Sequence, residues 1–335
     1  MTGLITLNHG SGFGMTHDLI STIFAKTFAM DEPLTDSAIL QGDGYRLAFT
    51  TDSYVIDPIF FPGGNIGKLS ICGTINDLAV SGAVPKFISV SVIIEEGFPV
   101  DDLFEIACSM ADEARKARVK IVTGDTKVVD KGKCDKIFIT TSGVGFVEER
   151  FANIGSAKGV VPGDTLIING PVGNHAVAVL GARNNLNFST SVLSDCASLN
   201  GLTMRVLKHC SGVHFMRDLT RGGLAVVLNE MVSMTGLGVS LNESSIPVDT
   251  PVRGLCEILG FDPLYLANEG KILFVVSRDE SNKVLELLRK EPEGKEASVI
   301  GEMVSEESNR VILNTEIGGR RILDIPSGIQ LPRIC

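Results

Sequence analysis

The 335-residue sequence has no apolar run approaching the roughly 18 residues that a membrane-spanning helix needs. Its first residues also lack the basic segment and the long apolar stretch of a secretory signal peptide. A formal net charge of −10 and the lack of a basic stripe argue against nucleic-acid binding. We therefore expect a cytoplasmic protein that binds neither a membrane nor a nucleic acid.

The seven cysteines include no C-x-x-C pair, which argues against a zinc site. An odd, scattered set is typical of reduced thiols in a reducing compartment, and we expect most of them to be small core residues. Cys335 is the last residue of the sequence, so the C-a-a-X lipidation pattern, which needs further residues after the cysteine, is absent.

Two common nucleotide-binding motifs nearly match and fail. A Rossmann fingerprint starting at Gly10 requires a glycine where Met15 stands. A P-loop ending at 67–68 requires a glycine where Pro62 stands and Ser or Thr where Leu69 stands. Neither familiar phosphate-binding loop is present, so binding of a nucleotide would need metal ions and local backbone donors.

Interspersed strand and helix patterns predict a two-domain α/β (α+β) protein. The helix predicted over 101–118 has the clearest apolar stripe (Leu103, Ile106, Ala107, Met110, Ala111, Ala114), and Asp102 with Glu105 resembles a capping box. A short strand over 120–123 leads into a turn at Gly124–Asp125. Other helices are predicted over 15–28 and 68–80, and other strands over 46–51, 87–94 and 136–145.

A glycine-rich stretch at 152–163 marks the predicted domain boundary, which gives domains at 1–152 and 153–324. The second half predicts strands over 164–169 and 271–277 and near residues 299, 311 and 322. Its predicted helices cover 195–209, 224–234 and 281–289.

Residues 325–335 form a segment in which two prolines and a glycine oppose helix formation. Fully extended, it would reach roughly 35 Å, far enough to carry the thiol of Cys335 from one site to another. The alternative is a frayed end that happens to finish in cysteine.

Five aspartates stand out. Asp43 lies in a glycine loop, and Asp52 and Asp125 follow predicted strands. Asp77 lies in the helix predicted over 68–80, and Asp218 comes just before a glycine-rich segment and a predicted helix. Magnesium prefers hard oxygen ligands, usually a few carboxylates together with phosphate oxygens and water. Each aspartate alone is explained by a turn or a helix cap. Their joint placement nevertheless predicts a magnesium site, and a helix beginning after Thr220 would add amide donors for phosphate.

One group of segments is distinctive when taken together: 42–43, 51–52, 64–85, 123–127 and 217–223. These segments resemble the ATP-binding superfamily of aminoimidazole ribonucleotide synthetase, which includes selenophosphate synthetase and thiamine-monophosphate kinase. Within it, the chain is similar over nearly its whole length to the HypE family of hydrogenase maturation proteins, which carry the Pro-Arg-Ile-Cys ending found at 332–335. Phe13 departs from the Gly-Ser-Gly-Gly pattern typical of the N-terminal loop.

The resemblance implies an N-terminal barrel-forming mixed sheet with helices, a C-terminal α/β sandwich and a flexible tail. It implies a homodimer with ATP and Mg²⁺ bound between subunits or domains. The implied enzyme is a carbamoyl dehydratase that converts an S-carbamoyl group on the terminal cysteine to a thiocyanate, a source of the cyanide ligands of [NiFe]-hydrogenase. HypF would supply the carbamoyl group, and the HypC–HypD complex would accept the cyanide.

On the matching positions, we assign Cys335 as the nucleophile and Lys127 as the cation that stabilises the transferring oxygen. We assign Glu269 as the general base that removes the N–H proton, with His175 and His214 as lower-ranked alternatives. The predicted metal ligands are Asp43, Asp52, Asp77 and Asp218. The predicted ATP-binding residues are Gly12, Asp43, Asp52, Lys68, Asn76, Asp77, Gly124, Asp125 and Thr220.

Two alternative functions stay open. Another synthetase of the same superfamily would share the ATP site without needing the terminal cysteine. Selenophosphate synthetase in particular would need a reactive cysteine near the N-terminal glycine loop, whereas the first cysteine here is Cys72. A non-catalytic scaffold that holds maturation partners would hydrolyse no ATP.

Overall fold

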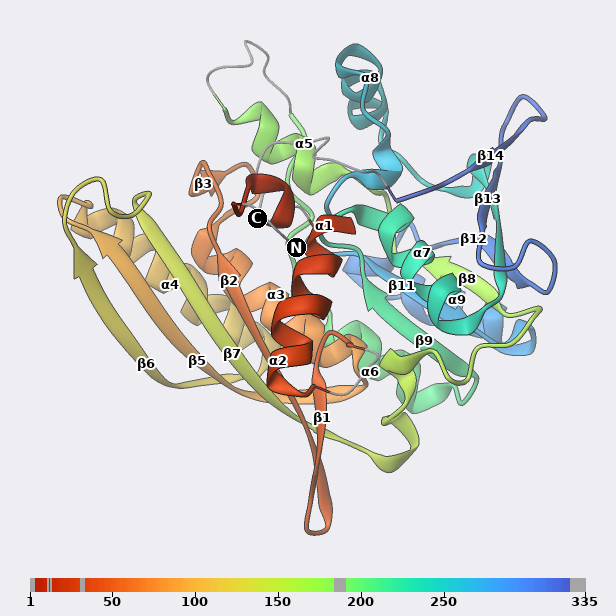
Figure 1. Ribbon diagram of the computed structural model, residues 1–335, viewed down its shortest axis with the longest axis horizontal. Helices are drawn as coiled ribbons and strands as arrows, with labels where there is room; N and C mark the ends of the chain where they lie inside the picture. Colours follow the sequence, from red (N-terminus) through yellow and green to blue (C-terminus); the bar gives the residue numbers. More distant parts are fainter. Residues whose placement is uncertain (1–3, 11, 13, 31–33, 184–190, 326–335) are drawn as a thin grey trace.

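Two mixed β-sheets with flanking helices make up the protein (Figure 1). The computed structural model describes residues 4–10, 12, 14–30, 34–183 and 191–325. The mixed α/β class predicted from the sequence is confirmed. Cys335 and the rest of the predicted tail beyond Ile325 lie outside the described residues.

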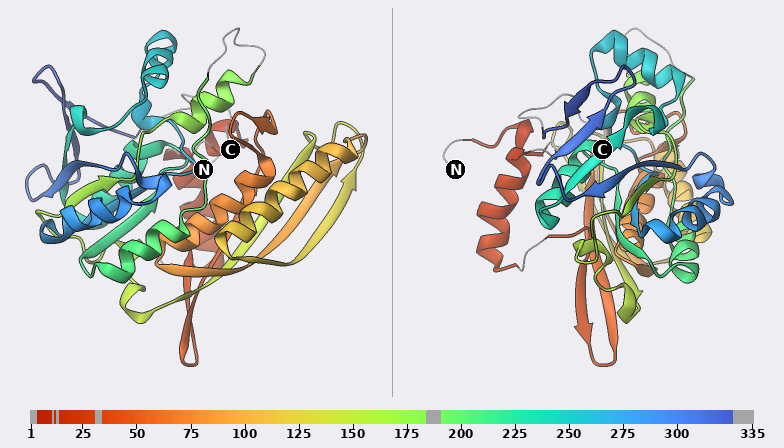
Figure 2. Two further views of the ribbon diagram at one scale, coloured as in Figure 1. Left: turned by 180° about the vertical axis from the view of Figure 1, so that it is seen from behind. Right: turned by 90° about the vertical axis from the view of Figure 1, so that its right-hand side faces the viewer.

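The first sheet has the order β1-β2-β7-β5-β6, in which only the β5–β6 pair is parallel. Helices α3 and α4 cover one of its faces (Figure 2). The strands of this half are β1 (Ala38–Gly42), β2 (Tyr45–Tyr54), β3 (Phe60–Phe61), β4 (Gly64–Asn65), β5 (Ala83–Glu95), β6 (Lys120–Val129) and β7 (Ile137–Val147). The helices are η1 (Leu7–Gly10), α1 (Gly14–Leu19), the π-helix η2 (Ile20–Ala25), α2 (Lys26–Phe28), α3 (Ile66–Val80) and α4 (Val100–Ala117).

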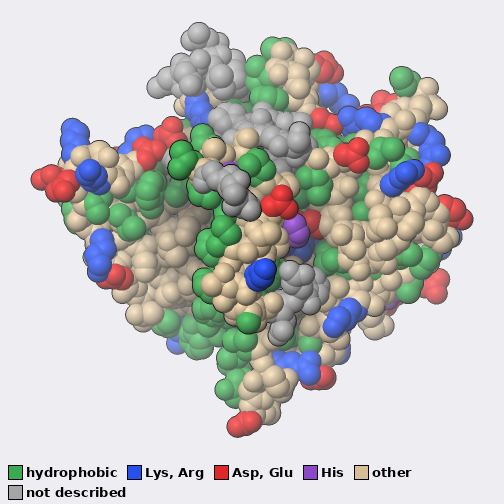
Figure 3. Space-filling model, in the orientation of Figure 1, with side chains coloured by type: hydrophobic (Ala, Val, Ile, Leu, Met, Phe, Trp, Pro, Cys, Tyr) green, Lys and Arg blue, Asp and Glu red, His purple; other side chains and the backbone are tan. Residues whose placement is uncertain are grey.

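The opposite face of the first sheet is open. Alternate residues of β7 such as Ile137, Ile139 and Thr141 are buried against the helices, and the residues between them point outward. Hydrophobic side chains follow the β1–β2 hairpin on this open face (Figure 3). Strands β1 and β6 are the two edges, so the barrel that the resemblance implies is not closed within one chain.

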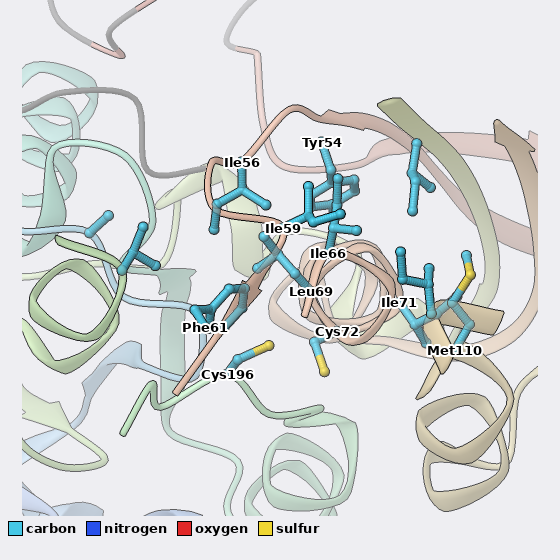
Figure 4. Packing of buried hydrophobic residues seen from close by; sticks show 14 of the residues in the cluster. Tyr54, Ile56, Ile59, Phe61, Ile66, Leu69, Ile71, Cys72, Met110 and Cys196 are labelled. Atoms are coloured by element: carbon cyan, nitrogen blue, oxygen red, sulfur yellow. The ribbon is translucent and has the colours of Figure 1, made fainter. Parts of the chain in front are cut away.

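Helix α3 lies between the first sheet and the second half of the chain, and it is therefore buried on nearly all sides. It begins at a cap in which the side chain of Asn65 accepts a hydrogen bond from the amide of Lys68 at 3.0 Å. Ile66, Leu69 and Cys72 of this helix pack in one cluster with residues of both halves (Figure 4).

The second sheet has the order β14-β13-β10-β12-β8-β11-β9, in which only the β10–β13 pair is parallel. Its strands are β8 (Thr165–Ile168), β9 (Val213–Asp218), β10 (Gly238–Asn242), β11 (Ile272–Val276), β12 (Ser298–Val304), β13 (Val311–Asn314) and β14 (Arg320–Ile322). The helices are α5 (Asn174–Gly181), α6 (Asn200–His209), α7 (Gly223–Thr235), α8 (Thr250–Leu259) and α9 (Ser281–Arg289). Short 3-10 turns are η3 (Glu149–Phe151), η4 (Ile154–Ser156), η5 (Glu243–Ser245), η6 (Pro263–Tyr265), η7 (Arg278–Glu280) and η8 (Pro292–Gly294).

The central strands of the second sheet are buried on both faces. Leu273 of β11 shares a core cluster with α7, whereas its neighbour Phe274 shares another with α6 and α9. Strands β8 and β11 accordingly read as continuous apolar runs.

Several expectations need correction. The strand predicted over 120–123 continues through Val129, so Gly124 and Asp125 lie inside β6 and not in a turn. Helix α4 follows Pro99 without a side-chain cap, so the predicted capping box is wrong, and Ala107 and Ala111 are exposed. The helix predicted over 195–209 begins only at Asn200. The patterns missed β1, α5, β9, β10 and α8.

Candidate functional site

Three aspartates from distant parts of the chain converge between the two sheets. Asp36 precedes β1, Asp77 lies near the end of α3, and Asp218 ends β9. One carboxylate oxygen of each lies within 4.8 Å of the others. Asp52 of β2 is close enough to raise the pKa of all three. The sequence predicted Asp52, Asp77 and Asp218 but missed Asp36, which stands in no glycine loop and follows no predicted strand.

Without a cation, the burial and mutual repulsion of these three carboxylates lower the stability of the folded protein. Burial raises the pKa of Asp36 from its ordinary value of 3.8 to about 6, although the nearby Arg217 opposes the shift. Burial first and neighbouring carboxylates next raise the pKa of Asp77 and of Asp218 well above 3.8. Arg217 Nε lies 2.9 Å from Asp36 Oδ1, and Thr50 donates a 2.7 Å hydrogen bond to Asp77.

The donor set fits a hard divalent cation. The three carboxylates offer the oxygen ligands that magnesium prefers, and a cation would remove the repulsion that raises their pKa values. Asp36, Asp77 and Asp218 would hold such an ion, with Asp52 beside them.

In the presence of a metal chelator, we expect the protein to be more stable at mildly acidic pH than at neutral pH. Because the pKa of Asp36 rises from 3.8 to about 6 on folding, the folded state binds more protons in this window, and stability falls as the pH rises through it. For Asp36 alone, moving from about pH 7 to about pH 5 should add about 1 kcal/mol. Thermal unfolding of the wild type and Asp36→Asn over this range measures the difference. Parallel pH profiles for the two proteins would contradict the assignment.

Two glycine-rich loops meet beside Asp218. A Cβ atom on Gly12 would lie 2.7 Å from Cβ of Arg221, so the N-terminal loop contacts the segment that leads into α7. Gly223 has a φ of +60°, and a Cβ there would lie 2.5 Å from the carbonyl oxygen of Leu266. The amides at the start of α7 and Thr220, which is half-buried, therefore lie next to the carboxylates, where a phosphate group would be bound.

Glu269 is buried, with 4% of its surface exposed, and it lies near enough to Asp218 and Asp52 for their charges to affect its pKa. Burial raises its pKa well above 4.5, and Asp218, Asp195 and Asp52 raise it further, whereas Arg221 opposes the shift. A carboxylate with a raised pKa is a better match for proton removal near neutral pH than an ordinary glutamate.

Two other predicted ATP-binding residues already bond to backbone groups. Asn76 is buried, and its amide nitrogen donates to the carbonyls of Ala197 at 3.0 Å and Glu269 at 3.4 Å. Its amide oxygen accepts from the N–H of Leu199 at 2.8 Å. The ammonium of Lys68 donates to the carbonyl of Gly63 at 3.0 Å. Contacts of Asn76 and Lys68 with a nucleotide stay predictions.

Asp43 is not brought to the cluster. It is exposed in the two-residue turn between β1 and β2, at the tip of the hairpin that projects from the molecule (Figure 1). At about 3.3 Å per residue along β2, this turn lies roughly 25 Å from Asp52.

Asp125 and Lys127 are also distant from the cluster within one chain. Lys127 Nζ lies 2.7 Å from Asp125 Oδ2, and both side chains are exposed on the edge strand β6. The register Asp125–Ser91–Thr140–Ser53 leads across the sheet to β2. Three strand spacings put the pair roughly 14 Å from β2. Gly124 allows the close approach of β5, since a Cβ there would lie 2.1 Å from the carbonyl oxygen of Val90.

The two histidines considered as alternative bases have other partners. His175 is fully buried, and its Nδ1 lies 2.8 Å from the hydroxyl of Ser194. His214 Nδ1 lies 2.7 Å from Oδ2 of the buried Asp164. Glu269 therefore remains the preferred candidate base, since the charges of Asp218 and Asp52 raise its pKa.

Among the helices that the structure describes, none combines the length and the apolar character that a bilayer crossing requires.

Comparison with known proteins places these residues in a family. Residues 34–147 match the N-terminal domain of AIR synthase related proteins, and residues 161–314 match their C-terminal domain. The carbamoyl dehydratase HypE of Rhodobacter capsulatus is 47% identical over 335 residues, which cover 99% of this chain and 98% of the relative.

Two solved structures are similar over most of the chain. One is the crystal structure of a HypE–HypF complex, with 46% identity, a TM-score of 0.86, and coverage of 92% of this chain and 99% of that chain. The other is a HypE crystal structure in complex with ATP, with 42% identity, a TM-score of 0.83 and coverage of 98% of both chains.

Proposed function

This chain belongs to the HypE family within the AIR synthase related proteins, and from that premise we propose that it is an ATP-dependent carbamoyl dehydratase of [NiFe]-hydrogenase maturation. The observation that carries the proposal is the convergence of Asp36, Asp77 and Asp218, together with the buried Glu269, whose pKa is raised by the charge of Asp218. A cation–phosphate site and a base then lie side by side, as an ATP-driven dehydration requires.

The proposed reaction converts an S-carbamoyl group on Cys335 to a thiocyanate, while ATP becomes ADP and phosphate. Oxide is a poor leaving group, so the amide oxygen must depart as phosphate and both N–H protons must be removed. Glu269 would take one of these protons and the departing phosphate the other, and the amides at the start of α7 would bind phosphate oxygens. Bound Mg²⁺ would neutralise phosphate charge.

The proposed ligand set for Mg²⁺ is Asp36, Asp77 and Asp218, with Asp52 nearby. Within one chain, four residues predicted for the ATP and catalytic sites lie away from the aspartate cluster: Asp43, Gly124, Asp125 and Lys127. They stay in the proposed sites only if a second copy of the chain brings them there.

A homodimer is supported by the open face of the first sheet. Its outward-facing residues include exposed apolar side chains on four strands: Leu40, Tyr45, Phe49, Phe87, Ile93 and Phe146. An apolar face of this kind is normally covered in a folded protein. A second copy seated there would close the two open sheets toward the barrel that the family resemblance implies.

We expect Phe49→Lys to convert the dimer to a monomer, since a charge would then be buried in the interface. Sedimentation velocity measures the change in molecular mass. Ile258→Lys, at a site on α8 that is 81% exposed, is the matched control and should stay dimeric. A wild-type protein that sediments as one chain at all accessible concentrations would rule out this interface.

The proposed partners are HypF as carbamoyl donor and the HypC–HypD complex as cyanide acceptor. The relative seen with HypF aligns over nearly all of its length with this chain, which supports the first assignment. We also propose a cytoplasmic location, in keeping with the free thiols of Cys72, Cys108, Cys134, Cys196, Cys210 and Cys256.

Intact-mass measurement tests the function in two steps. Incubation with HypF, carbamoyl phosphate and ATP should add the mass of one carbamoyl group, less one water in the molecules that also use this ATP for dehydration. Fresh MgATP added to the repurified protein should then remove the mass of one water and release phosphate. A sibling synthetase would gain no carbamoyl group, and a scaffold would release no phosphate.

A further inference from the structure

The backbone of Glu269 is held from two sides by buried polar groups. Its N–H donates to Asp195 Oδ1 at 3.1 Å. Its carbonyl accepts from the amide of Asn76 and from the N–H of Ala197, both at 3.4 Å. A loop that merely connected η6 to β11 would not need so many buried partners.

Asp195 is itself an unusual residue for the interior. Its side chain is 5% exposed, and Lys271 Nζ, whose side chain is 10% exposed, lies 3.2 Å from Oδ2. Burying such an ion pair costs desolvation energy that the attraction scarcely offsets, so the pair is poorly explained as a source of stability. The ion pair does provide a fixed hydrogen-bond acceptor for the backbone N–H of Glu269.

The segment around Asp195 also ties Glu269 to the metal-binding helix. A Cβ on Gly270 would lie 1.9 Å from the carbonyl oxygen of Asp195, so the two backbones are in direct contact. Asn76 holds the same segment through Ala197 and Leu199. Because Asn76 directly precedes Asp77 on α3, the position of Glu269 is set relative to a proposed metal ligand.

We propose that Asp195 is a positioning residue for the dehydration, with its carboxylate oxygen fixing Glu269 against α3 and Lys271 neutralising its buried charge. This inference rests on the proposed function, because it assumes that Glu269 acts as the base. Asp195 itself would touch neither ATP nor the carbamoyl group.

Two double variants isolate the hydrogen bond to Glu269. Asp195→Ala/Lys271→Met removes the ion pair as a unit and leaves no unpaired buried charge. Asp195→Asn/Lys271→Met removes the same charges but keeps an oxygen that can accept from the N–H of Glu269. Any difference between the two variants reports the acceptor alone.

The measurement is the single-turnover conversion of carbamoylated protein to thiocyanate at saturating MgATP, followed by intact mass. We expect the alanine variant to be slower by about 10- to 100-fold and the asparagine variant to recover most of the rate. Carbamoyl loading and the Kd for ATP should stay within about twofold of wild type in both, since a positioning role acts on the chemical step.

Adding Glu269→Gln to the alanine variant tests whether Asp195 acts through Glu269. If it does, the combined variant should be no slower than Glu269→Gln alone. Asp164→Ala is the stability control, because this buried aspartate also has a hydrogen-bonded side-chain partner, His214, but no bond to Glu269. It should lower the melting temperature and keep the conversion rate.

The outcomes separate the two proposals. Wild-type conversion by Glu269→Gln would overturn the assignment of the base and, with it, this inference. A slow Glu269→Gln protein beside equally fast alanine and asparagine variants would overturn the role of Asp195 alone. The role of Asp195 would also be overturned if the rate reductions of the alanine variant and of Glu269→Gln multiplied in the combined variant.

Discussion

Replacement of Cys335 by alanine is expected to abolish carbamoyl loading completely. The thiolate is the nucleophile toward the incoming carbamoyl group, and alanine offers none. Intact mass after incubation with HypF, carbamoyl phosphate and ATP would show the unmodified chain. Because the proposed ATP site lies among residues of the two sheets, binding of MgATP should be unchanged.

An exposed thiol among the described residues provides the matched control. Cys108 on α4 is exposed, whereas Cys72, Cys196, Cys210 and Cys256 are buried. Cys108→Ala should therefore load and convert the carbamoyl group as the wild type does. Peptide mapping that finds the carbamoyl group on Cys108 in the Cys335→Ala protein would defeat the assignment.

Helices and strands were predicted best from the sequence where the spacing of the apolar residues matches a single environment, such as one buried face. Helix α4 has a one-sided stripe, and Ile106 and Met110 of that stripe are buried as predicted. Strand β6 was predicted too short because Gly124 and Asp125 resemble a turn. The close approach of Val90, which only tertiary pairing reveals, instead makes glycine necessary inside a strand.

The candidate site was predictable in part. Asp77 and Asp218 stand in segments whose resemblance to the family is clear from the chain itself. Asp36 carries no such local signal, because its role depends on the contact of the segment before β1 with α3 and on the ion pair with Arg217. The hydrogen bond from Glu269 to Asp195 joins residues 74 positions apart, so it likewise could not be predicted from the sequence.

Asp218→Asn is expected to lower the ATP-dependent conversion of carbamoylated protein by more than about 100-fold. Replacement of residues that only support metal ligands typically lowers activity by about 10- to 100-fold, and Asp218 is itself a proposed ligand. Single-turnover mass measurements would record the loss. Carbamoyl loading of Cys335 should be normal, because that step precedes the use of ATP at this site.

The same substitution should stabilise the metal-free protein. The pKa of Asp218 is raised well above 3.8 by burial and by Asp36, so a neutral asparagine removes an unfavourable charge from the folded state near neutral pH. The melting temperature in chelator should therefore rise, while the increase that MgATP causes in the wild type should disappear. Asp164→Asn makes the same chemical change in a buried aspartate outside the cluster and should keep both the MgATP response and the conversion. A variant of Asp218 that melts lower in chelator yet retains its response to MgATP would show that the carboxylate supports the fold and not the cation.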